Sequence, residues 1–350
     1  MSSRRCSSHN ASSPPLAAIV TRPAPRQSHR RALLQCWQQC EVDSVLAMAV
    51  DSLGSSYRKP GAMALFDAQG GLSGSLSGGC LDAEIAEHAR ICLQQRRPQR
   101  LLLDTTDDDD LLFGSQSGCR GQIEILLWPS RAESPHPLQQ ILLEADAAHA
   151  TLKLRLQLGE PGLGAGQAQF AGKTLAWAGT GDADFDPGQR GVRLGLPPSP
   201  RLLLLGGGPE VPPLLEICAT AGWSTTVVEH RGRFLGERLG RADRVIECRP
   251  GQGPAQVDLA TLDAVVCMSH LYAEDLAALK LLAVSPVPWV GLLGPKLRRQ
   301  ALIGDLGPLA DALLDRLHAP VGLDLGGDGP EALAISIGAA LHQAFCWRSG

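Results

Sequence analysis

A cysteine in a glycine-rich turn, Cys80, is a residue of this 350-residue sequence whose position could favour a reactive thiolate. It follows Ser77-Gly78-Gly79 and precedes a segment with helical spacing. A thiol at a helix N-terminus lies near the positive end of the helix dipole, which lowers its pKa and favours the thiolate. Gly78 and Gly79 let the backbone approach a ligand closely. Cys80 is therefore a candidate metal ligand, although a small side chain that only fills space is the alternative.

A second cysteine, Cys119, lies in another glycine-flanked turn, Gly118-Cys119-Arg120-Gly121. The turn precedes an expected strand, so this thiol also lies at the end of an element. We consider Cys119 a second candidate ligand, with a packing role as the alternative.

The loop between Gly54 and Gly61 combines hydroxyl groups, cations and flexible backbone. Its candidate binding residues are Ser55, Ser56, Arg58 and Lys59. These groups suit a phosphate or another compact anion. Serine- and glycine-containing loops with two basic residues are also common on protein surfaces, so the loop alone is a moderate signal.

A third glycine-rich turn is typical of dinucleotide-binding folds. Gly206 and Gly208 follow a buried strand and open a helix, and Glu229 ends the next strand, where an acid usually binds a ribose hydroxyl. The third glycine of that pattern is replaced by Val211, and backbone N–H donors for a pyrophosphate are removed at Pro209, Pro212 and Pro213. The pattern predicts a Rossmann fold. NAD(P) is less favoured than a different phosphate-bearing ligand or a purely architectural turn.

His270 follows a predicted strand that ends at Met268. In α/β folds the carboxyl end of a strand commonly carries ligand-facing groups. His270 is thus a candidate cofactor-binding residue, with a structural or helix-capping role equally open.

The spacing of apolar residues predicts two α/β-type domains around a connecting region. Residues 1–27 contain basic but no acidic side chains and are rich in Ser, Pro and Ala, which is typical of a disordered tail. Residues 28–130 are expected to form an α+β or α/β domain, with helices at 28–39 and 81–95. Residues 131–200 are expected to connect the domains through one helix and a small strand pair. Residues 201–346 alternate strands and helices, which predicts a doubly wound parallel sheet.

Composition narrows the class of protein further. The formal net charge of −4 argues against general nucleic-acid binding, and no stretch approaches the roughly 20 apolar residues of a membrane span. The ten cysteines include no C-x-x-C pair, and scattered cysteines fit a reducing cytoplasm better than a disulfide framework.

Seven segments together resemble the XdhC/CoxI family, accessory proteins for xanthine dehydrogenase and carbon monoxide dehydrogenase. The resemblance covers nearly everything from about residue 40 to 345. Its specific parts are GSSYRKPGA at 54–62, LSGGCLDAEI at 76–85 and PVGLDLGGDGPEALAISIGAAL at 320–341, and the GC pair at 118–119 also matches. The remaining segments are 202–231, 268–280 and 289–296.

The resemblance implies an N-terminal cofactor-handling domain and a C-terminal Rossmann domain. It also implies that the protein binds molybdopterin-type cofactor, protects it during sulfuration and passes it to an apo-molybdenum hydroxylase. It further implies a homodimer that cooperates with a cysteine desulfurase. By position, Cys80 would retain the cofactor or handle sulfur, Cys119 would be second, and Arg58 and Lys59 would bind the pterin phosphate. A thiolate is a soft ligand suited to such a metal centre.

The sequence departs from the family pattern at four places. Met63 replaces a basic residue, and Cys119 is followed by Arg120 where a glycine is usual. Near the Rossmann turn a histidine is replaced by Pro209, and Pro295 replaces a small polar residue. The changes at Pro209 and Pro295 weigh against nucleotide binding by the C-terminal domain. They do not affect the turn at Cys80.

Three functions therefore remain open on the sequence. The favoured one is a molybdenum cofactor chaperone without enzymatic turnover. The alternatives are an NAD(P)-dependent oxidoreductase that uses the Rossmann domain and a non-catalytic scaffold that docks the hydroxylase. The sequence lacks a convincing hydride-transfer constellation, which weighs against the oxidoreductase.

Overall fold

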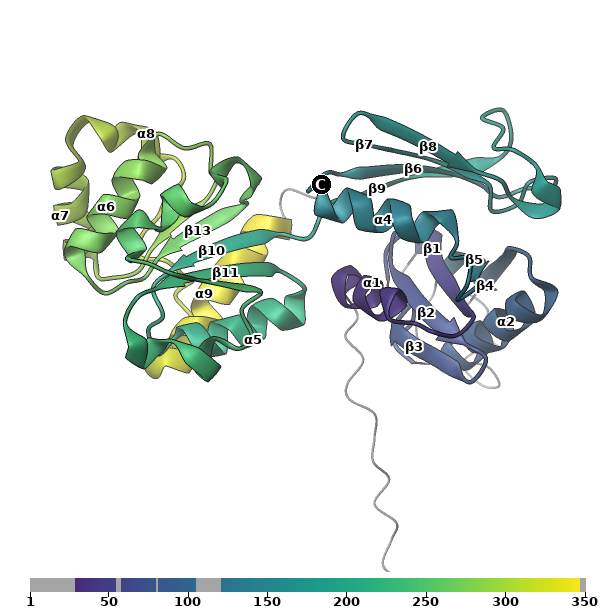
Figure 1. Ribbon diagram of the computed structural model, residues 1–350, viewed down its shortest axis with the longest axis horizontal. Coiled ribbons are helices and arrows are strands. Elements are labelled where there is room, and N and C mark those ends of the chain that lie inside the picture. Colours follow the sequence, from purple (N-terminus) through teal and green to yellow (C-terminus); the bar gives the residue numbers. More distant parts are fainter. Residues whose placement is uncertain (1–28, 55–57, 80, 105–120, 347–350) are drawn as a thin grey trace, which may run out of the picture.

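A computed structural model describes residues 29–54, 58–79, 81–104 and 121–346. These residues form a five-stranded, a four-stranded and a six-stranded sheet with helices between them (Figure 1). Within these ranges no helix is both long and apolar enough to cross a membrane.

The five-stranded sheet has the order β3-β2-β1-β5-β4 with antiparallel neighbours. Its strands are β1 (Ser44–Gly54), β2 (Met63–Asp67), β3 (Gly70–Gly74), β4 (Gln99–Asp104) and β5 (Gly121–Ser130). Helix α2 (Asp82–Gln95) covers one face through Ile85, Ala89 and Cys92. Helix α1 (Arg30–Gln38) packs on the other face through Leu33, Leu34 and Trp37. Because both faces are covered, β1 is a continuous apolar run rather than an alternating one.

The segment after β5 contains more structure than the expected helix and strand pair. Helix α4 (Pro137–Ala147) is followed by a four-stranded antiparallel sheet of order β8-β7-β6-β9. Its strands are β6 (Leu152–Gln157), β7 (Gly166–Phe170), β8 (Lys173–Trp177) and β9 (Gly191–Leu196). The prediction of a small strand pair was therefore wrong.

One hydrophobic core joins α1, α4 and the two antiparallel sheets. Met48 and Trp128 from the five-stranded sheet share it with Leu138 of α4 and with Leu154 of β6. The Trp128 indole donates a hydrogen bond to the Gly164 carbonyl at 2.8 Å, beyond the end of β6. Residues 131–196 thus pack against the preceding elements as part of the same hydrophobic unit.

The C-terminal sheet confirms the predicted Rossmann-like fold. Six parallel strands have the order β12-β11-β10-β13-β14-β15, which is the 3-2-1-4-5-6 order of doubly wound dinucleotide-binding folds. The strands are β10 (Arg201–Leu205), β11 (Ser224–Glu229), β12 (Arg244–Glu247), β13 (Ala264–Cys267), β14 (Val290–Leu292) and β15 (Leu317–His318). The helices are α5 (Val211–Ala221), α6 (Tyr272–Ala283), α7 (Lys296–Leu306), α8 (Asp311–Leu314) and α9 (Gly329–Cys346).

Polar contacts connect this sheet to the ends of α1 and α4. Arg31 donates hydrogen bonds of 2.5 and 2.8 Å to the Asp243 carboxylate. Arg201 donates to the carbonyls of Asp146 and Ala147, and Ser199 donates to the Asp146 carboxylate. The contact between the two parts is therefore polar, in contrast to the apolar core that joins the antiparallel sheets.

Candidate functional site

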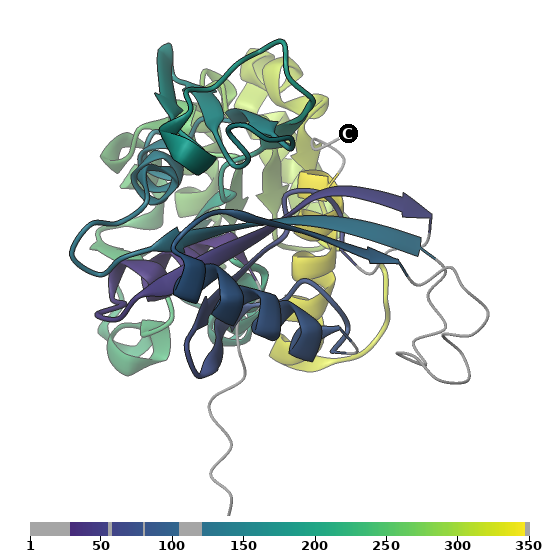
Figure 2. The same ribbon diagram turned by 90° about the vertical axis from the view of Figure 1, so that its right-hand side faces the viewer.

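Three of the sequence motifs flank one end of the five-stranded sheet. Gly54, which ends β1, pairs with Gly121, which begins β5, and Gln122 pairs with Asp104 at the end of β4. On the other side Gly74, which ends β3, pairs with Ala64 near the start of β2. Figure 2 shows these strands, coloured purple to blue, extending together in one direction. The segments 55–62 and 105–120 therefore join strands at this end of the sheet. The segment 75–81 leaves the sheet on the same side but seven residues further back along β1, because Gly74 and Ala47 both pair with Ala64.

The turn before α2 is organised by a buried hydroxyl. Ser77 is 4% exposed, and its Oγ accepts hydrogen bonds from the backbone N–H groups of Gly79 at 3.0 Å and Leu81 at 3.4 Å. The same hydroxyl donates to the Asp82 carboxylate at 2.5 Å. The hydroxyl of Ser77 thus fixes both flanks of position 80 to the start of the helix.

The glycines of this turn leave room for a ligand. Gly79 has φ +109°, a conformation that favours glycine, and a Cβ placed there would meet no atom within 4 Å. Gly78 and Gly79 are both exposed. The backbone of this turn is therefore open to close approach from solvent.

The two basic residues of the loop between Gly54 and Gly61 differ in exposure. Lys59 is exposed, whereas Arg58 is half-buried. The Lys59 carbonyl accepts a hydrogen bond from Ala62, which closes the loop before β2. Lys59 is thus the more accessible of the two for an anionic group.

Four candidate residues, Cys80, Cys119, Ser55 and Ser56, lie outside the described residues. The acidic residues that follow position 80 reduce the expected effect of the helix dipole on a thiol there. Helix α2 carries Asp82 and Glu84 in its first turn, and these carboxylates offset the positive end of the dipole. The effect of the helix on a thiol at position 80 is consequently smaller than the sequence pattern alone suggests.

The buried cysteines Cys92 and Cys218 differ from a reactive thiol. Cys36, Cys40, Cys92, Cys218, Cys248 and Cys267 are free, and burial raises the pKa of Cys92 and Cys218 to about 12. Such thiols stay protonated and serve as small packing groups. The described part of the chain also contains no cluster of three His, Cys, Asp or Glu side chains suited to a metal ion.

In the Rossmann domain Glu229 binds protein groups rather than facing a cavity. Its side chain is 0% exposed, and its carboxylate accepts hydrogen bonds from the backbone N–H groups of Gly207, His230 and Arg231 at 2.8 to 2.9 Å. The Arg231 guanidinium adds two more, at 2.6 and 2.9 Å. Burial opposes ionisation, but these hydrogen bonds outweigh it and lower the pKa to about 2. Glu229 is a candidate cofactor-binding residue because an acid at this position usually binds a ribose; in the structure its carboxylate fastens β11 to the glycine turn.

The start of α5 lacks the free donors that a pyrophosphate needs. The Val211 N–H bonds to the Gly208 carbonyl at 3.1 Å, Pro212 and Pro213 have no N–H, and the Leu214 N–H bonds to the Glu210 carbonyl. Among the described residues the first turn of α5 therefore offers no unpaired backbone N–H. The lower ranking of NAD(P) among the possible ligands of this turn stays a prediction.

A buried carboxylate also occupies this corner of the domain. Glu210 is 2% exposed, and its Oε1 lies 2.8 Å from His270 Nε2. This hydrogen bond raises the pKa of His270, and the left-handed backbone of His270 (φ +59°) positions the ring. A Cβ on Gly208 would lie 2.5 Å from Glu210 Oε1 and 2.9 Å from His270 Nε2. The structure thus brings Gly208 and His270 together around Glu210.

Sequence reasoning missed the roles of Ser77 and Glu210. The only sequence signal for Ser77 is its place in a Ser-Gly-Gly turn, where a serine hydroxyl can bond a backbone N–H two residues on; Ser77 is not the helix cap, because the N-cap of α2 is Leu81. For Glu210 the signal was weaker, because an acid beside a glycine-rich turn is also common at solvent-exposed helix starts.

Comparison with known proteins identifies two matching family models. Residues 37–104 match the XdhC and CoxI family, and residues 202–341 match the XdhC Rossmann domain. The first match ends before β5, and the second begins in β10. The motifs at 54–62 and 76–85 therefore lie within the first matched range. The glycine turn and Glu229, at 206–229, lie within the second.

Individual relatives extend the similarity over most of the chain. A probable xanthine dehydrogenase subunit of Bacillus subtilis is 27% identical over 330 residues, which is 89% of this chain and 96% of the relative. The uncharacterized protein YqeB of Escherichia coli is 25% identical over 300 residues, 85% of this chain and 43% of its own length. A crystal structure described as a xanthine dehydrogenase from Bacillus halodurans superimposes with a TM-score of 0.74 at 29% identity, covering 91% of this chain and 96% of that one.

Proposed function

Because the chain belongs to the XdhC and CoxI family, we propose that it binds molybdenum cofactor and delivers it to a molybdenum hydroxylase of the xanthine dehydrogenase type. The observation that supports the proposal is that the pairing of the strands places the ends of the three motif-bearing connections on the same side of the five-stranded sheet. A cofactor with a phosphate, a pterin and a thiophilic metal needs donors of different kinds at one place, and these connections supply them. The protein acts as an accessory protein rather than as an enzyme.

The residues around this end of the sheet fit such a cargo. Lys59 is an exposed cation for the phosphate, and the open backbone at Gly79 admits the flat pterin. Cys80 supplies the sulfur ligand, and Ser77 holds the turn on both sides of that position. Binding in this proposal is retention of a ligand, with no bond made or broken by the protein.

We expect Cys80→Ala to lower the amount of copurified pterin by at least about tenfold, because loss of a metal ligand weakens retention of the whole cofactor. Protein is purified anaerobically after co-expression with cofactor biosynthesis, and oxidised pterin is measured by fluorescence. Cys248→Ala is the matched control, since this half-buried thiol lies in the Rossmann domain. Wild-type protein without pterin, or equal retention in Cys80→Ala, would contradict the proposal.

The proposal extends to the partners and compartment of the protein. The acceptor is an apo-hydroxylase, a cysteine desulfurase provides the sulfur for sulfuration, and the chaperone is a cytoplasmic homodimer. The xanthine dehydrogenase names of the relatives support the acceptor, and the free described cysteines are compatible with a reducing compartment. A docking scaffold without cargo would instead bind the hydroxylase equally well in the Cys80→Ala variant and in a pterin-free preparation.

A further inference from the structure

The outward face of the four-stranded sheet carries a basic patch, defined here as Lys153, Arg155 and Arg193. Along β6 the side chains of Leu152, Leu154 and Leu156 enter the core, so Lys153 and Arg155 point the other way. Cross-strand pairing places Arg193 of β9 on the same outward face. In Figure 1 helix α4 lies along one face of this sheet and no helix covers the opposite face.

Two of these cations directly oppose each other. Arg155 pairs with Arg193 across the β6–β9 ladder, and Lys153 is one step further along the same face of β6. Like charges at directly opposed positions destabilise a sheet, so the pair has a cost in the isolated protein. Such a cost is typical of surfaces whose charges are matched by a partner.

Among the described residues, no carboxylate lies within ion-pair distance of the patch. Within the described ranges, none of the three cations forms an ion pair or a hydrogen bond, and Arg155 instead lies over the Phe185 ring at 5.6 Å. By contrast, the nearby Lys173 is paired with Glu144 of α4 at 2.8 Å. The basic patch therefore has no ion-pair partner among the described residues, although Asp184 and Asp186 flank the phenylalanine that lies over Arg155.

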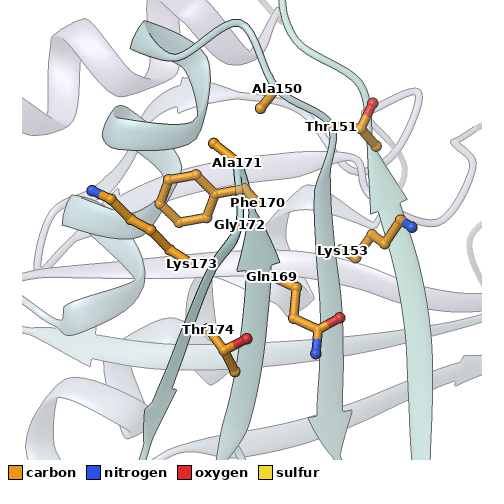
Figure 3. Close-up of a pocket in the computed structure, with 9 residues that line it drawn as sticks. All are labelled: Ala150, Thr151, Lys153, Gln169, Phe170, Ala171, Gly172, Lys173 and Thr174. Carbon is orange, nitrogen blue, oxygen red and sulfur yellow. The ribbon is translucent and has the colours of Figure 1, made fainter.

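Neutral hydrogen-bonding groups continue the patch across the sheet. Lys153 pairs with Gln169 of β7, which pairs with Thr174 of β8, so these three side chains form a row. They border a hollow of about 480 Å³ at the end of the sheet that carries the Ala171-Gly172 turn (Figure 3). A ligand lying along the row would meet an ammonium, an amide and a hydroxyl in succession.

We propose that this outward face binds an acidic, extended segment of a partner protein. Neighbouring strands are about 4.8 Å apart, so carboxylates spaced along one extended segment can reach Arg155, Arg193 and Lys153 together. Each guanidinium can bind a carboxylate with two parallel hydrogen bonds. The inference goes beyond the proposed cargo function and depends only on the charge pattern of this sheet.

An acidic protein segment fits the patch better than a nucleic acid does. The whole chain has a formal net charge of −4, which repels a long polyanion outside the patch. The patch itself has three cations beside Gln167 and Gln169, and Thr174 completes the row. The area is thus matched to a few carboxylates and not to a continuous phosphate backbone.

The test measures binding of a fluorescent octaglutamate peptide by anisotropy at low ionic strength. We expect the triple variant Lys153→Glu, Arg155→Glu and Arg193→Glu to weaken binding by at least about tenfold. The matched control, Arg131→Glu, Arg244→Glu and Lys280→Glu, makes the same change in net charge at exposed positions elsewhere. It is expected to weaken binding by less than about threefold, because long-range charge effects are screened.

A second measurement separates docking from general attraction. We expect Arg193→Gln to raise the thermal midpoint of the free protein by about 1–2 °C by removing the repulsion with Arg155, while it weakens peptide binding. Equal losses in both triple variants, or tighter binding of a thymidine oligonucleotide than of octaglutamate, would overturn the inference. So would an absence of peptide binding to the wild-type protein at millimolar concentration.

Discussion

Replacing Glu229 with glutamine is expected to lower the free energy of unfolding by about 3 kcal/mol. The carboxylate is fully buried and accepts five hydrogen bonds, from Gly207, His230 and three N–H groups of Arg231. A glutamine amide keeps the shape but turns one acceptor into a donor, which then faces another donor. It also leaves the partly buried Arg231 guanidinium without its counter-charge. Urea unfolding followed by tryptophan fluorescence measures the effect.

The loss of stability caused by Glu229→Gln is expected to become smaller as the pH falls. Because the pKa of Glu229 falls to about 2 in the folded protein, its ionised form stabilises the fold above the ordinary glutamate pKa. This contribution disappears as pH falls from about 4.5 towards 2. The difference in stability between wild type and Glu229→Gln should therefore be full at pH 7 and shrink on acidification.

The matched control is Glu216→Gln on α5 in the same domain. Glu216 forms an exposed ion pair with Arg241 at 2.9 Å, with both side chains more than half exposed. Exposed pairs contribute little, so the change should stay within about 1 kcal/mol at every pH. Equal effects of the two substitutions, or a Glu229→Gln effect that grows on acidification, would contradict the role assigned to Glu229.

A second large effect is expected from Gly206→Ala, which should cost at least about 3 kcal/mol. Gly206 has φ +129°, and a Cβ there would lie 2.4 Å from the Met268 carbonyl oxygen and 2.8 Å from the Ser269 Cα. Both contacts are backbone atoms at the end of β13, so neither can turn away as a flexible side chain would. The substitution must therefore separate β10 from β13, the two central strands of the sheet.

Gly304→Ala is the control, and it is expected to raise the free energy of unfolding rather than lower it. Gly304 lies inside α7, and a Cβ there would meet no atom within 4 Å. Alanine should stabilise this helix by about 0.5–1 kcal/mol, because it reduces the freedom of the unfolded chain. Chemical unfolding of both variants beside wild type gives the comparison, and a tolerated alanine at position 206 would refute the close approach of β10 and β13.

The Rossmann domain was largely predictable because its local signals agree with its tertiary structure. Strand Ser224–Glu229 was predicted with the bounds observed, and α5 ends just before Gly222, as expected for a glycine in the left-handed conformation. The roles of Glu229 and Glu210 were not predictable in this way. Glu229 bonds groups after β10 and β11, and Glu210 bonds His270 after β13, and spacing along the chain does not give these contacts.

The four-stranded sheet was harder to predict because three of its strands are weakly apolar. Strand β8 is exposed at four of its five positions, and β9 contains Gly191 and Gly195. Their pairing is determined by β6, whose leucines enter the core, and by turns that only the folded chain brings together. The pattern rule that identified β6 therefore had little to recognise in its neighbours.

For the candidate site, sequence identified the motifs but not their meeting place. Gly54 and Gly121 are 67 positions apart, and it is their pairing across β1 and β5 that brings the connections to one end. Periodicity indicates where strands occur, whereas register requires the three-dimensional sheet. The role of Ser77 likewise became evident only when its three hydrogen-bond partners were seen together.

The core shared by the two antiparallel sheets has a consequence for dissecting the protein. The family match at 37–104 ends before β5, yet β5 is inserted between β1 and β4 and carries Trp128 into a core completed by α4 and β6. A fragment cut at either residue 104 or residue 130 would expose that core, so neither cut releases an autonomous module. The smallest fragment that keeps this core covered extends from α1 through β9. The segment matched by the family model is therefore shorter than the segment that must fold together.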